Sequence, residues 1–302
     1  MPLSTTRDVT ITTVVDNYSN ALLKSEPGVI ERYGPDKEPL LAEHGLCMHI
    51  QLGSEGTEIL LDAGYSRVAL PHNLSCLGID PAKVNQVVIS HGHRDHTAAL
   101  AEFLQLSGRR VPVIVHADAF LERWFIFPDG TRMGPWHENA RQWEQAGAEI
   151  IHLEKPYELA PGCLVTGPVP RRADFEKGVP VAYYRKGQEL VHDPINDDQA
   201  IVINVEGKGL VIVAGCAHSG IVNTVLYARE ISGVREVWAI IGGFHLGDGM
   251  TEQIERTIVE LEAIGPRLVA PAHCTGFAAK RRFAAQMSDQ FLLNAVGSRL
   301  AF

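Results

Sequence analysis

The sequence predicts an α/β fold in which short apolar strands alternate with helices. Two observations lead to this prediction. Runs rich in Val and Ile, which are typical of buried strands, recur along the chain, and several precede segments whose apolar residues have helical spacing. Side chains that can bind metal stand repeatedly at the ends of these runs, where strand gives way to helix. A cleft at one edge of a layered sheet structure would bring such side chains together.

The N-terminal third predicts three strands, a surface loop and a helix. The strands are the apolar runs at residues 8–15, 47–52 and 58–62. Residues 25–39 are rich in Pro, Gly and charged side chains and therefore predict a surface loop. A helix is expected over residues 66–77. His44 precedes the second strand and could either line a cleft or have a structural role.

A fourth strand leads into a cluster of metal-binding residues. Residues 84–90 are dominated by Val and Ile, and they run directly into the sequence His-Gly-His-Arg-Asp-His at residues 91–96. Apolar residues at helical spacing begin at Thr97 and stop near Gly108, ahead of another apolar strand at residues 111–116. The cluster is therefore expected at a turn between a strand and a helix.

The spacing inside this cluster predicts a site for two metal ions. In extended chain His91 and His93 project to the same side, whereas Asp95 and His96, one turn into the next element, face a second point nearby. Imidazole nitrogens and carboxylate oxygens are ligands that zinc, iron and manganese accept, and an open coordination position can activate water. A histidine-rich surface turn is the alternative, but four metal-binding side chains in six residues after a buried strand disfavour it.

Residues 120–143 break the alternation and are predicted to be irregular. The segment concentrates aromatic side chains among Gly, Pro and Arg, namely Trp124, Phe125, Phe127, Trp136 and Trp143. Aromatic density in an irregular segment indicates a substrate wall or lid, with Trp124 and Trp136 as candidate substrate-binding residues. A satellite hydrophobic cluster or a contact between subunits is the alternative explanation.

The middle of the chain predicts more strands and an arginine pair. The strands are the apolar runs at residues 150–153, 163–166, 200–205 and 209–214, the last two joined by a Glu-Gly-Lys-Gly hairpin signal. Arg171 and Arg172 stand together in a Pro-bounded turn and could bind a phosphate or a carboxylate. Surface arginines are more often only solvated, so this role is the less expected one.

The last third repeats the pattern of strand, ligand-bearing turn and helix. Cys216 and His218 follow the run at 209–214 and precede a helix expected over residues 221–231. Runs at 237–241 and 267–270 end in His245 and His273, with a helix over residues 251–264 between them. His245 could be a ligand, a general acid near the leaving group, or a residue that only lines the cleft. The tail from 277 to 302 is expected to form one closing helix.

The HxHxDH pattern of residues 91–96 resembles the signature of the metallo-β-lactamase superfamily. The resemblance implies a four-layer αββα sandwich with two metals in a cleft at its edge, His91 and His93 on one metal and Asp95 and His96 on the other. It also implies that His273 is the final ligand. Asp62, in a motif of the form LxDxG, would support the ligands from behind without binding metal.

One position departs from the superfamily pattern. Where many members have a Gly-Asp whose aspartate bridges the metals, this chain has Gly215 followed by Cys216. Either Cys216 or His218 must then supply the ligand. We favour His218, because an imidazole two residues further on can reach into the same cleft.

Four stretches together resemble one branch of the superfamily, named for the archaeal 7,8-dihydropterin-6-methyl-4-(β-D-ribofuranosyl)aminobenzene 5′-phosphate synthase. They are Asp197-Asp198-Gln199, Gly215-Cys-Ala-His-Ser-Gly220, Gly242-Gly-Phe-His245 and His273-Cys-Thr-Gly276. The resemblance implies a condensation of a pterin pyrophosphate with an aromatic amine, which needs an aromatic slot and a group that binds anions. Trp124, Trp136, Arg171 and Arg172 are the candidates for these roles.

Composition narrows the class of protein. The net charge of −9 disfavours nucleic acid as a partner, since a phosphate backbone requires a basic face. Five cysteines without CxxC spacing disfavour a disulfide framework and fit a cytoplasmic location. The first residues lack a signal sequence, and about eighteen uncharged apolar residues never run together, so no membrane association is expected. We expect one domain over residues 1–302, with a homo-oligomer left open.

The leading hypothesis is a metal-dependent hydrolase whose two metal ions activate water against a phosphoester, ester or lactone of a small molecule. Zinc is the first expectation, with iron or manganese as alternatives. Asp95 could also accept the proton of the reacting water. Alternative hypotheses are the pterin-type synthase, a non-catalytic sensor of a small ligand, and oxygen chemistry at a di-iron site. The expected ligands are His91, His93 and His218 for one metal and Asp95, His96 and His273 for the other.

Overall fold

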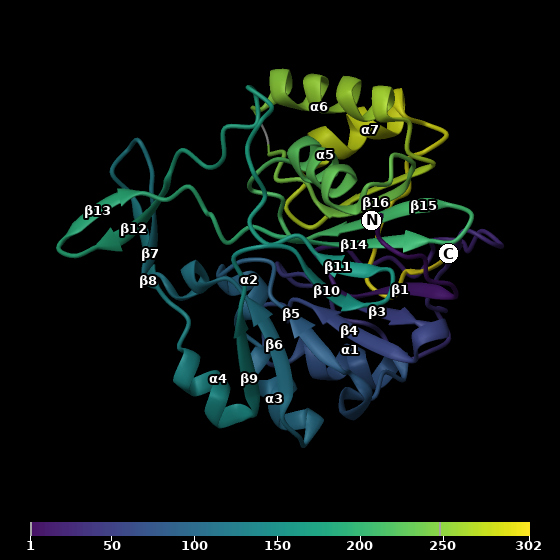
Figure 1. Ribbon diagram of the computed structural model, residues 1–302, viewed down its shortest axis with the longest axis horizontal. Coiled ribbons are helices and arrows are strands. Elements are labelled where there is room, and N and C mark those ends of the chain that lie inside the picture. Colours follow the sequence, from purple (N-terminus) through teal and green to yellow (C-terminus); the bar gives the residue numbers. More distant parts are fainter. Residues whose placement is uncertain (1, 248) are drawn as a thin grey trace.

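Two large β-sheets pack face to face, with helices on both outer sides, in the computed structural model, which describes residues 2–247 and 249–302 (Figure 1). Within these residues the first sheet has eight strands in the order β2-β18-β1-β3-β4-β5-β6-β9, and the second has six in the order β10-β11-β14-β15-β16-β17. A third sheet of four strands, β13-β12-β7-β8, projects from one side. The structure therefore confirms the predicted α/β sandwich and adds a small sheet to it.

The strands have the following bounds. The first sheet comprises β1 (Val9–Val15), β2 (Ile30–Glu31), β3 (Cys47–Leu52), β4 (Thr57–Leu61), β5 (Gln86–Val88), β6 (Val111–Val115), β9 (Ala148–His152) and β18 (Arg299–Ala301). The second comprises β10 (Tyr157–Ala160), β11 (Cys163–Val165), β14 (Ala200–Val205), β15 (Gly209–Ala214), β16 (Val237–Gly243) and β17 (Leu268–Ala272). The third comprises β7 (Arg123–Ile126), β8 (Arg132–Trp136), β12 (Ala182–Lys186) and β13 (Glu189–His192).

Helices cover both outer faces of the sandwich. On the side of the first sheet lie α1 (Ala69–Leu77), α3 (Leu100–Ser107) and α4 (Ala140–Ala146), and on the side of the second lie α5 (Ile221–Ser232), α6 (Thr251–Ile264) and α7 (Phe277–Gln286) (Figure 1). The short α2 (Arg94–Thr97) lies at the edge between them. Within the described residues, no helix is long and apolar enough to span a bilayer.

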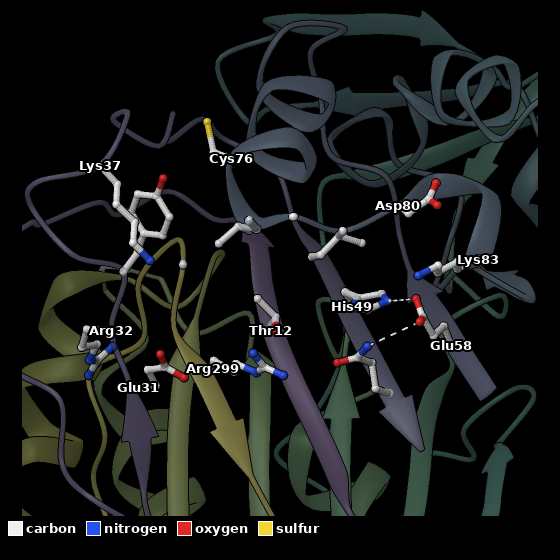
Figure 2. A pocket seen from close by; sticks show the side chains of 16 residues that line it. Thr12, Glu31, Arg32, Lys37, His49, Glu58, Cys76, Asp80, Lys83 and Arg299 are labelled. Carbon is white, nitrogen blue, oxygen red and sulfur yellow. Dashed lines mark hydrogen bonds and ion pairs between the residues drawn. The ribbon is translucent and has the colours of Figure 1, made fainter. Parts of the chain in front are cut away.

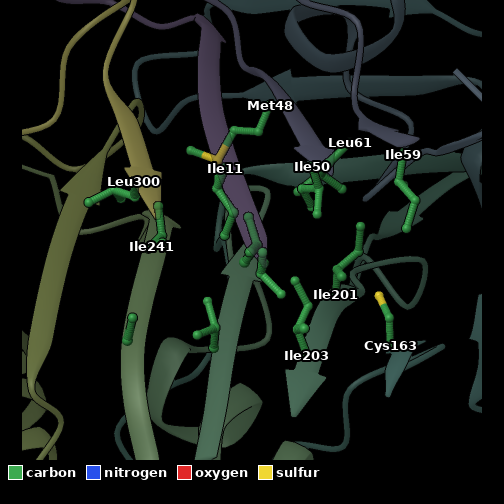
Figure 3. Close-up of a cluster of buried hydrophobic side chains, with 14 of the residues drawn as sticks. Ile11, Met48, Ile50, Ile59, Leu61, Cys163, Ile201, Ile203, Ile241 and Leu300 are labelled. Carbon is green, nitrogen blue, oxygen red and sulfur yellow. The ribbon is translucent and has the colours of Figure 1, made fainter. Parts of the chain in front are cut away.

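The central core lies between the two sheets. Ile11 and Ile50 from the first sheet face Ile201, Ile203 and Ile241 from the second, and all five side chains are buried (Figure 3). Burying an isoleucine of this kind contributes about 1.5–3 kcal/mol. This packing fixes the two sheets against each other, and with them the strand ends that carry the candidate ligands.

Parallel pairing brings those strand ends to one edge. In the second sheet β15, β16 and β17 run parallel, and in the first sheet β4, β5, β6 and β9 do the same. Parallel strands end at a common edge, which is where α/β folds place their ligand-binding residues. The turns after β5, β15, β16 and β17 carry the candidate ligands, so these turns meet.

The prediction that residues 120–143 are irregular is wrong. The segment contains β7, β8 and part of α4, and Trp124 in β7 pairs across the third sheet with Tyr183 in β12. The sequence analysis did not detect these strands because β12 is remote in sequence, and β8 carries Pro135, which suits only an edge strand.

The prediction of one helix from 277 to 302 is also wrong. Helix α7 ends at Gln286, and the chain then returns as β18, which pairs antiparallel with β1. Gly297 has a φ of 80°, which interrupts a helix, and Leu300 is buried against the core. The last strand is therefore β18 in the first sheet, and the strand predicted at 267–270 is β17 of the second.

The N-terminus of α5, which follows the turn that carries His218, is capped by an acidic side chain from a distant loop. The side chain of Glu176 accepts hydrogen bonds from the backbone N–H groups of Val222 (2.9 Å) and Asn223 (2.8 Å). Burial nevertheless raises the pKa of Glu176 to about 7, because these donors only partly replace water. The folded protein therefore keeps this carboxyl protonated at a pH where the unfolded chain has already lost the proton.

The contribution of Glu176 to stability should fall as the pH rises from about 4.5 to about 7. Its pKa is higher in the folded state, so the folded state binds more protons in this window, and deprotonation costs up to about 3 kcal/mol of unfolding free energy. Urea unfolding of wild type and Glu176→Gln across this range measures the effect. The free energy of the wild type should decline relative to the variant, and parallel profiles would contradict the prediction.

Candidate metal centre

The expected ligands meet where the carboxyl ends of both sheets adjoin. They fall into two groups, and within each group the ligand atoms lie within 4.8 Å of one another. One group is His91, His93 and His218; the other is Asp95, His96 and His273. The loop after β5 and helix α2 supply four of these residues, and the turns after β15 and β17 supply the other two.

The first group consists of three buried imidazoles. Nε2 of His218 lies 3.0 Å from Nε2 of His91, and within residues 2–247 and 249–302 no hydrogen-bond partner is found for the buried Nε2 of His93. Burial lowers the pKa of His93 to about 3 and also lowers the pKa values of His91 and His218. Three neutral imidazoles whose nitrogens converge are chemically suited to a metal ion.

The second group contains the carboxylate. Oδ2 of Asp95 lies 3.1 Å from Nε2 of His273 and 3.7 Å from Nε2 of His96. Burial alone would raise the pKa of Asp95, but His96 and His273 outweigh burial and lower it. The group therefore offers an ionised oxygen and two imidazole nitrogens, a donor set that zinc, iron or manganese accepts.

Cys216 lies between the two groups. Its Sγ is 3.1 Å from Nε2 of His96, and it shares further clusters of potential ligands with His91, with His218 and with His273. Both Cys216 and His218 therefore lie among potential ligands, and which of the two supplies the ligand stays open. A thiol at this position can contact either metal position.

Asp62 lies behind the ligands, as the sequence resemblance implied. Its Oδ2 accepts hydrogen bonds from Oγ of Ser90 (2.8 Å) and Nδ1 of His96 (2.6 Å), and its Oδ1 accepts the backbone N–H of Ser90 (2.7 Å). Burial lowers the pKa of His96, but Asp62 and Asp95 outweigh burial and raise it to about 9. Because Nδ1 of His96 donates to Asp62, its Nε2 faces the centre, where a bound metal ion would take the place of the proton.

Replacing Asp62 with asparagine should lower metal affinity by about 10–100-fold, the usual cost of losing a carboxylate behind a ligating histidine. Both residues have the same shape, so the change mainly removes the charge that orients His96. Competition with a chromogenic zinc chelator measures the affinity. Asp80→Asn is the matched control, since Asp80 only accepts the backbone N–H of Ala82 away from the centre, and unchanged affinity in Asp62→Asn would refute the proposed role.

Three supporting contacts were not predicted from the sequence. Asp16 accepts the backbone N–H of His273 (2.9 Å), and Oδ1 of Asn17 lies 3.0 Å from Nδ1 of the same histidine. On the other side of the centre, Asp197 accepts the backbone N–H of Gly92 (2.7 Å). All three are polar residues at strand ends, which is the signal that could have identified them.

A cavity of about 620 Å³ opens over the centre. One wall comes from the third sheet, where the rings of Phe125 and Trp136 lie 5.0 Å apart between centroids. The ring of His93 is 5.5 Å from Phe125 and 5.9 Å from Trp136, so this wall stands directly beside the first group of ligands. Arg94, an exposed cationic residue of α2, also lines the cavity.

Comparisons with known proteins agree with this geometry. A family model described as a beta-lactamase superfamily domain matches residues 57–161. The 7,8-dihydropterin-6-methyl-4-(beta-D-ribofuranosyl)-aminobenzene-5'-phosphate synthase of Methanocaldococcus jannaschii is 31% identical over 267 residues, covering 86% of this chain and 90% of that protein. The chain belongs to the metallo-β-lactamase superfamily.

Other members of the superfamily are more distant. A UPF0173 metal-dependent hydrolase of Ignicoccus hospitalis is 24% identical over 195 residues, covering 65% of this chain and 66% of that protein. The crystal structure of Tm1679, described as a metal-dependent hydrolase of the beta-lactamase superfamily, superposes with a TM-score of 0.76 at 23% identity, covering 97% of this chain and 98% of that one. This likeness confirms the metallo-β-lactamase fold over nearly the whole chain.

The structure brings only some of the expected substrate-binding residues to the cavity. Trp136 lines it, whereas Trp124 is buried beneath the guanidinium of Arg185, 4.7 Å from its ring centroid. Arg171 donates to the carbonyl oxygen of Pro194, and the half-exposed Arg172 forms an ion pair with Glu230. Neither arginine is among the residues that line the cavity.

His245 and His44 both line the cavity. The ring of His245 lies 4.3 Å from that of His218 between centroids. Nε2 of the exposed His44 lies 3.5 Å from Oδ2 of Asp95, which places it at the mouth of the metallo-β-lactamase cleft. Both positions agree with a role in lining the cleft, which the sequence had left as one of several possibilities for each histidine.

A second hollow, of about 270 Å³, lies on the outer face of the first sheet beside α1 (Figure 2). Its histidine, His49, already has a carboxylate partner, since Nε2 lies 2.9 Å from Glu58. Every group of potential metal ligands found among the described residues lies instead at the edge of the sandwich. Among residues 2–247 and 249–302, metal binding is therefore expected at that edge.

Proposed function

We propose that this protein is a metal-dependent hydrolase with two metal ions, acting on a phosphoester, ester or lactone of a small molecule. The observation that supports this function best is the convergence of two ligand groups at the base of one open cavity. Zinc is the metal we expect first, with iron and manganese as alternatives. When bound, the two ions would supply Lewis acidity and an activated water.

The side chains of the site would have separate roles in metal binding and in orienting water. His91, His93 and His218 would hold one ion, and Asp95, His96 and His273 the other. Asp95 has a lowered pKa and is a weak base, so its contribution is to orient the reacting water by accepting a hydrogen bond.

His245 is the candidate proton donor to the leaving group. It lines the cavity, and its pKa is raised because contact with Cys274 outweighs the effect of burial. A protonated imidazole at this place in the cavity can give its proton to a departing oxygen.

The aromatic wall supports a second candidate function. Phe125 and Trp136 would suit a flat ring held beside the first ligand group, and the archaeal relative is named as a synthase of a dihydropterin compound. The corresponding reaction here would join a pterin pyrophosphate to an aromatic amine. Arg94, rather than Arg171 or Arg172, would then be the cation nearest an anionic group of the substrate.

Native mass spectrometry followed by a substrate screen tests the proposal. The mass excess over the chain counts metal ions and any retained ligand at once. Two ions per chain, with turnover of phosphoesters or lactones that a chelator abolishes, are the expected result. Turnover only of a pterin pyrophosphate with an aromatic amine would favour the synthase, and a chain that binds no added zinc, iron or manganese would refute both functions.

A further inference from the structure

Cys274 adds a second sulfur to the centre. This residue follows His273 directly, and its Sγ, the Sγ of Cys216 and a ring nitrogen of His273 all lie within 4.8 Å of one another. A zinc ion with bonds of about 2.3 Å to sulfur and about 2.0–2.1 Å to nitrogen holds its ligand atoms no more than about 4.6 Å apart. The three atoms are therefore close enough that small side-chain movements would place them around one ion.

The backbone is shaped to bring Cys274 to this position. Consecutive side chains of an extended strand point to opposite faces, so His273 and Cys274 would normally diverge. His273 instead has a left-handed conformation with a φ of 46°, which lets both side chains reach the centre. Such strain in a non-glycine residue is characteristic of functional sites.

The surroundings of Cys274 also leave room for its sulfur. A Cβ atom on Gly243 would come within 2.6 Å of the Sγ of Cys274 and 2.4 Å of the carbonyl oxygen of Gly215, so only glycine fits there. The backbone N–H of His245 donates to the same Sγ at 3.3 Å. A donor of this kind stabilises a thiolate, which is the form of cysteine that binds metal.

We propose that Cys274, together with Cys216 and His273, forms an alternative ligand set for the second metal ion, in which two thiolates take the places of Asp95 and His96 while imidazoles alone hold the first ion. This inference rests on the proposed two-metal centre and deepens it by restricting the metal. Thiolates favour zinc or iron(II) over manganese, which prefers oxygen ligands. The two halves of the centre would therefore differ in chemistry, with manganese excluded from the second.

Cobalt(II) in place of zinc tests the inference, because a cobalt–thiolate bond absorbs in the near ultraviolet through charge transfer. We expect wild-type protein loaded with cobalt to show this band. Its intensity per bound cobalt should fall about twofold in Cys274→Ser and in Cys216→Ser, and vanish in the double variant. Cys76→Ser, which removes a thiol outside the ligand groups, is the matched control and should keep the full band.

The outcomes separate this inference from the proposed function. Cobalt bound without the band in wild type, or a full band in Cys274→Ser, would overturn ligation by Cys274 and leave the two-metal hydrolase standing. A wild-type chain that binds no cobalt would refute the proposed centre itself, and this inference with it.

A labelling experiment on the wild-type chain covers the case in which a variant fails to fold. Cys274 lines the cavity and is only partly buried, so iodoacetamide is expected to alkylate it in metal-free protein. Zinc should protect it from alkylation, as read by peptide mass spectrometry. Equal labelling with and without zinc would overturn the inference.

Discussion

Replacing His93 with glutamine is expected to remove one metal ion and, with it, metal-dependent turnover. The first ligand group consists of three imidazoles, and the Nε2 of His93 is the nitrogen for which no hydrogen-bond partner is found within the described residues. Changes to the groups behind a ligand already cost about 10–100-fold in activity or affinity, so loss of a ligand should cost at least about a hundredfold. Native mass spectrometry and a steady-state assay measure the two effects.

The glutamine is chosen to keep the buried volume. His93 packs edge-on against Phe125 and Trp136, and an alanine would leave a cavity whose effect on folding would confuse the result. His72→Gln is the matched control. This histidine lies on α1, outside the ligand groups, and its side chain is hydrogen-bonded to the carbonyl oxygen of Pro39. A His93→Gln variant that retained both ions and wild-type turnover would show that this group is not the metal site.

The ligand-bearing turns could be placed from the sequence because their signal is local. Each follows an apolar run that belongs to a parallel strand buried on both faces, and such strands are almost continuously apolar. The boundaries of α6 at Thr251 and Ile264 were predicted correctly, since its apolar residues repeat at helical spacing and Gly265 ends it. Local composition was sufficient wherever neighbours in sequence are also neighbours in space.

The parts of the cleft that depend on distant pairing could not be predicted. The aromatic wall exists because β7 pairs with β12, and neither strand has an alternation that reveals the other. From composition alone, Trp124 and Trp136 were equally good candidates for the cavity wall. Strand pairing decides that Trp136 lines the cavity and that Arg185 covers Trp124. Cys274 could not be predicted as a candidate ligand from the sequence. Its proposed role depends on the left-handed conformation of His273, for which the sequence carries no signal.

Replacing Arg123 with methionine should lower the unfolding free energy by about 3–5 kcal/mol, the cost of leaving buried charges without their partner. This buried arginine donates through Nε to Asp193 (2.7 Å) and through Nη1 to Asp197 (3.0 Å). Burial alone would raise the pKa of Asp197, and Arg123 is the main group that lowers it instead. Urea unfolding near pH 7, where both aspartates are ionised in the unfolded chain, measures the loss.

Two companion variants decide whether the loss comes from unpaired charge. Arg185→Met breaks the exposed ion pair with Glu122 and the cation–π contact with Trp124, and together these losses should cost no more than about 2 kcal/mol. Adding Asn at both Asp193 and Asp197 to Arg123→Met should recover much of the lost stability, because the triple variant buries no net charge. If Arg123→Met cost as little as Arg185→Met, the buried network would contribute nothing special to stability.

The same network should also affect the metal centre. Asp197, held by Arg123, accepts the backbone N–H of Gly92 in the histidine loop, and Gly92 packs so closely that an added Cβ would lie 2.6 Å from Nη1 of Arg123. Folded Arg123→Met protein should therefore bind zinc more weakly than wild type, whereas Arg185→Met should not. Undiminished zinc affinity in the folded variant would show that the strand end, and not this network, fixes the loop.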